Sequence, residues 1–305
     1  MTIRKASPDT HQNCRSLLQK AVRRGCVSLI PKVVNHLVDV GDLDWLRNRV
    51  GVITFEECWP LGIRLKTKPE VREISRILSE VALNVKQKDA AGLGALAYEL
   101  SKGDNTVIFD PIADHSIRMI AEAIKKPIEF WAWIEKESGA EQNLLVESAH
   151  SAFKHGGWPW DRAFMQAAAL LAVTNGIPII EKKFNLECSE INFPFWAAID
   201  KHTEEGKEGI KIAAEKTGQN AKKISWLFFY FASSVENEMA PSYWWKREME
   251  WRLHKIGFTL SEAEKNWKMV YPVIRDILRE KEESLKIHIS AEQEISQTPK
   301  QLSLF

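Results

Sequence analysis

The sequence lacks the features that mark zinc ribbons, secreted scaffolds and membrane proteins. Its four cysteines, Cys14, Cys26, Cys58 and Cys188, lie far apart in 305 residues and form no C-x-x-C pair. This spacing argues against a zinc site or a disulfide framework and fits a reducing cytoplasm. The first residues are polar, so no signal peptide is expected. No uncharged apolar run approaches the roughly 18 residues that cross a bilayer, so we expect a cytoplasmic protein without a membrane partner.

An excess of charge and the common catalytic motifs are also missing. Lys and Arg total 42 against 41 acidic residues, so no global field attracts nucleic acid, and any basic surface must be local. The sequence contains no G-x-x-x-x-G-K-[S/T] loop to hold phosphates, no H-E-x-x-H pair and no G-x-S-x-G elbow. We therefore expect a protein that is not an enzyme and that holds no cofactor and no metal.

What the sequence does contain is apolar residues at helical spacing. Hydrophobic residues make up 45% of the chain and charged residues 27%, a composition typical of a globular protein with a sizeable core. The spacing predicts helices over residues 16–40 (broken at 24–25), 44–55, 69–85, 117–124, 128–134, 144–153, 161–174, 195–204, 206–215, 221–235, 243–255 and 261–283. Asp161 is the expected N-cap of its helix and Gly176 the stop signal. Only residues 106–109 favour a strand, so we predict an all-α, predominantly helical fold.

An apolar cluster reappears at the end of a polar segment. Residues 286–300 are rich in Gln, Glu, Ser and Lys and poor in apolar anchors, so they are expected to form a flexible tether. After them come Gln301, Leu302, Ser303, Leu304 and Phe305. A glutamine can donate and accept hydrogen bonds at the rim of a groove, while the leucines and the phenylalanine fill an apolar pocket.

This pentapeptide resembles the peptide by which bacterial polymerases and repair factors bind the replication sliding clamp. That pattern is Gln-Leu-Ser/Asp-Leu-Phe, and all five positions match. The resemblance implies that the bacterial β sliding clamp is a partner. The alternative is that residues 302–305 fold back onto the body as a terminal anchor.

The body of the chain carries a second resemblance. The run SLLQKAVRRG at residues 16–25, the later Val40-Gly41-Asp42, and Glu56, Glu57 and Gly62 look like the C-terminal helical region of the clamp-loader-like ATPases RarA or MgsA. Residues 163–172 (AFMQAAALLA) are similar to an Ala-Gln-Ala helix of that family, and residues 200–203 resemble a late segment. In those relatives the region follows an ATPase core and forms the oligomerising collar.

The resemblance implies a collar-like helical body without a motor, because the chain begins where the ATPase core would end. It divides the chain into a collar-like start (1–65), a divergent or inserted helical element (66–150), a collar-like continuation (151–285) and a disordered tail (286–305). A separate ATPase subunit and a second copy of the chain are both implied as further partners.

One segment is a candidate for binding single-stranded or branched DNA. Residues 242–255 interleave aromatic and basic side chains, which stacking on bases and contact with phosphates require; the candidates are Trp244, Trp245, Lys246, Arg247, Arg252 and Lys255. Glu248 and Glu250 lie in the same run, so we favour the alternative of a helix with a tryptophan core face and a mixed-charge solvent face. A second basic stretch comprises Arg64, Lys66, Lys68, Arg72 and Arg76.

Two weaker patterns have structural alternatives. Residues 92–97 (GLGALA) satisfy a G-x-G-x-x-A dinucleotide fingerprint, with Asp114 about 20 residues later. No buried strand precedes them, so we interpret them as a small-residue face of a helix. Asp110, Asp114, His115 and Glu147, with His150 and His155 nearby, are the candidates for an unrecognised site, yet their spacing matches no metal-ligand pattern.

Together these patterns predict a non-catalytic accessory protein of DNA replication or repair that binds the clamp at the nucleoid. Three alternatives stay open: a collar and clamp-contact subunit of a separate clamp-loader-like ATPase, a mobile-element protein that captures the host clamp, and an enzyme acting on nucleic acid.

Overall fold

The computed structural model describes residues 8–110, 114–182, 188, 190–199, 201–232 and 239–296. Throughout these ranges the regular structure is helical, and the extended segments meet only in isolated bridges such as Cys58 with Gln87. The prediction of an all-α fold is confirmed. No helix in these ranges has both the length and the apolar composition that crossing a membrane requires.

The first group of helices encloses its own apolar core. It comprises α1 (Pro8–Arg24), α2 (Leu29–Asp39), α3 (Leu43–Glu57), the 3-10 helix η1 (Trp59–Arg64) and α4 (Val71–Leu83). Leu17, Ile30, Ile53 and Leu78 are fully buried between these helices. Gly25 (φ 76°) and Gly41 (φ 92°) adopt the left-handed conformation in the two tight joints, where glycine carries no steric penalty.

The second group forms around α5, which is buried along most of its length. It comprises α5 (Asp89–Ser101), η2 (Asn105–Val107), α6 (His115–Lys125), α7 (Pro127–Glu137), α8 (Ala140–His155) and α9 (Pro159–Asn175). A Cβ added at Gly92 would lie 2.3 Å from the backbone of Trp244, and one at Gly94 would lie 2.8 Å from the backbone of Ala163. The glycines therefore allow neighbouring helices to approach α5 closely, which confirms their interpretation as a packing face.

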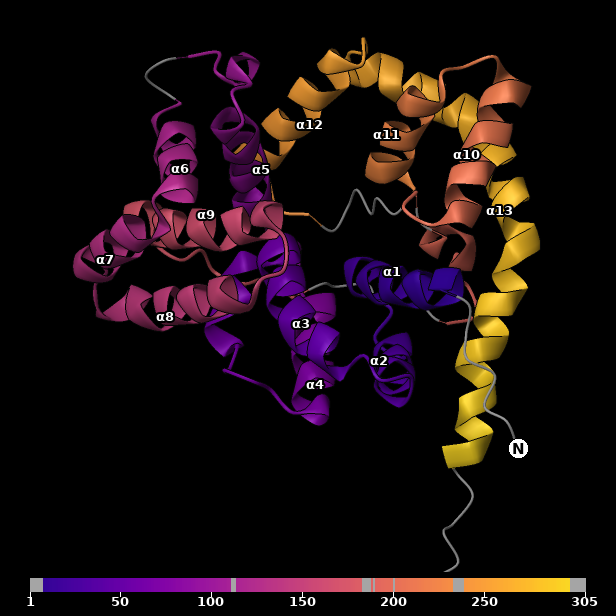
Figure 1. Cartoon of the computed structure of the whole chain (residues 1–305), viewed down its shortest axis with the longest axis horizontal. Helices are drawn as coiled ribbons and strands as arrows, with labels where there is room; N and C mark the ends of the chain where they lie inside the picture. Colours follow the sequence, from indigo (N-terminus) through magenta and orange to yellow (C-terminus); the bar gives the residue numbers. More distant parts are fainter. Residues whose placement is uncertain are drawn as a thin grey trace, which may run out of the picture.

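The last group comprises η3 (Phe195–Ala198), α10 (Glu204–Thr217), α11 (Ala221–Phe231), α12 (Tyr243–Lys255) and α13 (Leu260–Ser296). It lies along the first group and reaches the second, since α12 packs against α5. Figure 1 shows α13 as a long helix along the edge of the molecule, beside α10 and then past α1 and α2. Val270, Ile274 and Leu278 of α13 are fully buried against α10 and α11.

Several local predictions were wrong at the ends of elements. Residues 106–109 form no strand, because Asp104 caps a 3-10 turn there by accepting the backbone N–H of Thr106. The helix expected over residues 195–204 is only the short η3, and α10 begins after Thr203, whose hydroxyl accepts the N–H of Gly206. In addition, α13 contains Pro272 and continues past residue 285 to Ser296, although the tether was expected to begin at 286.

Candidate functional site

The predicted clamp-binding residues, Gln301, Leu302, Ser303, Leu304 and Phe305, lie outside the described residues. What the structure gives is the element that leads toward them. Leu285 of α13 is 1% exposed and belongs to the core of α1, α2 and α4. At about 1.5 Å per residue, the backbone of α13 continues roughly 16 Å beyond Leu285. In Figure 1 its end extends past α2, so the helix before the peptide leads away from the body.

The candidate DNA-binding residues of α12 divide into interior and surface groups. Trp244 is 9% exposed, and its backbone N–H donates to Asp89 at the start of α5. Arg247 is buried, forms an ion pair with the fully buried Asp114, and donates to the carbonyl oxygen of Val107 at 3.2 Å. Its charge is therefore used to join α12 to the loop before α6.

Arg252 is likewise held inside the protein. Its Nε lies 2.6 Å from Glu248 and its Nη1 3.2 Å from Glu99, and its guanidinium lies against the Trp226 ring. The hydroxyl of Tyr230 donates to both carboxylate oxygens of Glu248, at 2.9 and 3.0 Å. Burial, together with this carboxylate, raises the pKa of Tyr230 well above its usual value. This network supports the favoured interpretation of α12 as a helix with a tryptophan core face.

The other three candidates on α12 lie nearer the surface. Trp245 is half-buried, and the Lys88 ammonium lies 4.1 Å from the centre of its ring. Lys255 forms an ion pair with Asp104. Lys246 alone has a strongly exposed side chain, 68%, and its nearest acidic partner is Glu250 at 3.9 Å. The aromatic and basic residues of α12 therefore do not form one continuous surface.

The four candidates for an unrecognised enzyme site do not share one cleft. Asp114 accepts the backbone N–H groups of Phe109 (2.7 Å) and Asp110 (3.0 Å) besides the Arg247 pair. His115 lines a shallow groove between α6 and α7, whereas Glu147 lines a different cleft beside α3. Across the described ranges, no three His, Cys, Asp or Glu side chains are arranged to hold a metal ion.

The residues that carried the family resemblance meet in a buried charge network. Arg23 of α1 donates to Glu57 at 2.6 Å and to Glu56 at 2.9 Å, both at the end of α3. Lys88 lies 3.3 Å from both carboxylate oxygens of Glu57. Burial alone would raise the pKa of Glu57, but the attraction of Arg23 and Lys88 outweighs it and lowers this pKa to about 2. The network joins α1, α3 and the start of α5.

Asp161 also forms an ion pair between helices, so the prediction that it caps its helix was wrong. The helix α9 begins at Pro159, so Asp161 lies in its first turn and accepts from Arg49 of α3 at 2.7 Å. Burial raises the pKa of Asp161 above its usual value even though the Arg49 charge lowers it. This pair fixes the connection between α8 and α9 against α3.

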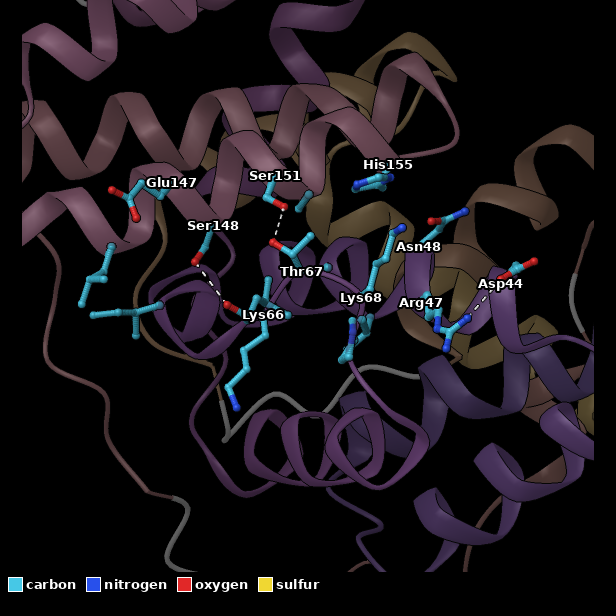
Figure 2. A pocket seen from close by; sticks show the side chains of 17 residues that line it. Asp44, Arg47, Asn48, Lys66, Thr67, Lys68, Glu147, Ser148, Ser151 and His155 are labelled. Carbon is cyan, nitrogen blue, oxygen red and sulfur yellow. Dashed lines mark hydrogen bonds and ion pairs between the residues drawn. The ribbon is translucent and has the colours of Figure 1, made fainter.

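A cleft of about 710 Å³ with a mixed polar and apolar lining opens on the face formed by α3, residues 63–69 and α8 (Figure 2). The floor is close-packed, since a Cβ on Gly51 of α3 would lie 3.0 Å from Ala152 of α8. The loop after η1 is tied to α8 by two hydrogen bonds: Ser148 donates to the Leu65 carbonyl oxygen at 3.4 Å, and the Thr67 and Ser151 hydroxyls lie 3.2 Å apart.

Lys68, in the middle of this loop, has an unusual backbone. Its φ is 53°, the left-handed region, and it is the one non-glycine residue with positive φ within the described part of the chain. The following residue, Pro69, further restricts the backbone of Lys68. Such a conformation costs on the order of 1–3 kcal/mol and is held by the surrounding structure. The sequence marked Lys68 as part of a basic stretch but contained no signal for its conformation or for its neighbours on α3 and α8.

Comparisons with known proteins leave the family of the chain undefined: no protein-family model, no curated protein and no solved structure matches it.

Proposed function

We propose that this protein is a non-catalytic accessory factor of DNA replication or repair that binds the bacterial β sliding clamp through residues 301–305. The observation that carries the proposal is the match of Gln301, Leu302, Ser303, Leu304 and Phe305 to the clamp-binding pattern at all five positions. The peptide follows a polar segment. Its apolar side chains are unfavourable in water and become favourable when a binding groove removes them from it.

The chemistry of the peptide suits a weak and exchangeable contact. Burial of each leucine or phenylalanine side chain contributes about 1.5–3 kcal/mol, from which the cost of ordering the peptide and of association is subtracted. The net corresponds to a roughly micromolar dissociation constant. Clamp partners must exchange, so an affinity in this range serves the function.

The position of α13 supports the same proposal. This helix is anchored in the core up to Leu285, and its last turns lead past α2. A peptide attached to it can bind a groove on another protein while the helical body stays free to make a second contact. Once the peptide is bound, that second contact of the body is effectively intramolecular.

The resemblance of the body to a clamp-loader-like collar supports a second candidate, a clamp-contact subunit of a separate ATPase. Arg23, Glu56 and Glu57, which carry part of that resemblance, meet in one buried network, so they form a single structural unit. Purification of the chain with a second protein, with ATPase activity only in the mixture, would favour this candidate over an adaptor that acts alone.

The test is a calorimetric titration of purified β clamp against the intact chain and against variants of the peptide. We expect roughly micromolar binding for the intact chain. Binding should be lost in the chain without residues 301–305 and in the double variant Leu304→Ala, Phe305→Ala. The matched control is Ser303→Asp, which should bind normally because the pattern accepts either residue. Equal binding of the intact and shortened chains, or no binding by the intact chain well above micromolar concentrations, would contradict the proposal.

A further inference from the structure

The cleft beside α3 gathers hydrogen-bond donors from three separate elements. Asn48 comes from α3, Lys68 from the loop before α4, and His155 from the last residue of α8. Figure 2 shows the Lys68 side chain extending toward the same region as Asn48 and His155. Within the described residues none of these three side chains forms a hydrogen bond or an ion pair. They therefore present an ammonium, an amide and an imidazole to whatever enters the cleft.

The two acidic side chains of the cleft do not pair with these donors. Figure 2 shows Glu147 at the far end of the cleft from Lys68, whereas Asp44 lies on the same side as Asn48 and is paired with Arg47 at 3.4 Å. Lys66 lies in the same loop but forms an ion pair with Glu73 at 2.8 Å. The part around Lys68 is consequently rich in donors, as a site for a phosphate group requires.

An exposed aromatic side chain lies beside these donors in the chain. Trp158 follows His155 in the connection between α8 and α9, and it is 73% exposed. The ion pair between Arg49 and Asp161, 2.7 Å, holds this connection against α3, the helix that also carries Asn48. A tryptophan exposed to this extent, three residues along the chain from His155, is suited to stack on an unpaired base.

We propose that this cleft binds single-stranded nucleic acid: Lys68, Asn48 and His155 contact a backbone phosphate, and Trp158 stacks on an adjacent base. The strained backbone of Lys68 fits this role, because a residue held in a costly conformation is positioned before the ligand arrives. The volume of about 710 Å³ is within the range of small-molecule sites and accommodates a nucleotide. None of the residues of this site belongs to the peptide 301–305, so the inference does not rest on binding of the clamp.

The test uses fluorescence anisotropy of a labelled oligothymidylate with the full chain at several salt concentrations. We expect Trp158→Ala to weaken binding by roughly tenfold, the loss typical of one stacked base. Lys68→Gln should weaken binding and also lower the slope of log affinity against log salt by about 0.7, because one phosphate contact is lost. A general defect in folding would lower the affinity without this specific change in the salt dependence. Both side chains are exposed, and an unchanged urea midpoint verifies the fold of each variant.

The matched control is Lys246→Gln on α12, which also removes an exposed positive charge, but from the other candidate surface. This variant should bind like the unmodified chain. Failure of the unmodified chain to bind the oligonucleotide at low salt would overturn the proposal. So would unchanged binding by both Lys68→Gln and Trp158→Ala, or an equal loss with Lys246→Gln.

Competition distinguishes the two sources of a phosphate group. Thymidine monophosphate and inorganic phosphate should compete only at concentrations far above those of the oligonucleotide, because they lack the linked phosphates and bases of a strand. Displacement by either at an equal phosphate concentration would assign the cleft to a small phosphorylated molecule and overturn the assignment to a nucleic-acid strand.

Discussion

The substitution Glu57→Gln provides the sharpest test of what holds the helical body together. The Glu57 side chain is 1% exposed and is the common partner of Arg23 and Lys88, which are 13% and 4% exposed. Glutamine keeps the shape and the hydrogen-bonding ability of this side chain but removes its charge. Lys88 then lacks its carboxylate partner, and Arg23 loses one of its two carboxylates and keeps Glu56.

The loss in the free energy of unfolding for Glu57→Gln is similar by two independent arguments. Removal of one partner from a buried ion pair typically lowers the free energy of unfolding by about 3–5 kcal/mol, since an uncompensated charge stays buried. A pKa of about 2 in place of the usual 4.5 corresponds to about 3 kcal/mol of preference for the ionised form in the folded protein. Either value is a large part of the roughly 5–15 kcal/mol that stabilises a folded domain.

The lowered pKa of Glu57 fixes the direction in which its stabilising contribution changes with pH. The pKa of Glu57 is lower in the folded protein than in the unfolded chain, so its stabilisation is fully present above pH 4.5 and is lost as the pH falls through about 2. The difference in unfolding free energy between the unmodified protein and Glu57→Gln should therefore shrink over this interval. Urea denaturation followed by tryptophan fluorescence, at pH 7 and at steps down to about pH 2, measures it.

Glu122→Gln is the control, because Glu122 is also paired with a lysine, Lys125 at 3.1 Å, but its side chain is 61% exposed. An exposed pair of this kind contributes about 0–1 kcal/mol. The reasoning is refuted if Glu57→Gln changes the unfolding free energy no more than Glu122→Gln does. A difference from the unmodified protein that stays constant with pH would refute it as well.

Two further pairs of substitutions, each a test with its control, examine the contacts around α5 and α12. Gly92→Ala places a Cβ 2.3 Å from the backbone of Trp244, so it should lower the urea midpoint by an amount equivalent to about 1–3 kcal/mol. Gly157→Ala, which meets no atom within 4 Å, should change stability by less than about 0.5 kcal/mol. Arg247→Ala leaves the fully buried Asp114 without its cation and should cost about 3–5 kcal/mol, whereas Lys246→Ala on the exposed face should cost less than about 0.5 kcal/mol. Equal effects within either pair would show that the close approach, or the buried ion pair, does not contribute as the geometry implies.

The helices were predictable because their signal is local. In α4, Ile74, Ile77, Leu78 and Val81 recur at helical spacing, and all four side chains are buried in the structure. Gly176 ends α9 with a φ of 79°, as expected of a glycine stop signal. The pentapeptide at residues 301–305 is also a local pattern, so its proposed partner depends on chemistry that is contiguous in the chain.

Charged residues were the least predictable, because their partners come from distant parts of the chain. The composition of α12 is compatible with a DNA-binding helix as well as with the favoured core helix, and only the positions of Asp114 and Glu99 show that Arg247 and Arg252 are occupied. Asp161 was expected to cap a helix, a local role, but Arg49 of α3 binds it instead. In each case the cost of burying a charge selects a partner of opposite charge wherever the fold provides one.

Apolar periodicity alone thus determined that the chain folds into helices and which of their faces are buried, since water drives those faces inward whatever their neighbours are. Tertiary structure decided which polar groups meet. It placed Asn48, Lys68 and His155 in one cleft, although they lie on three elements and one of them has a left-handed backbone that no sequence pattern marks. Hydrogen bonds and ion pairs act over a few ångströms, so such meetings exist only once the helices have packed.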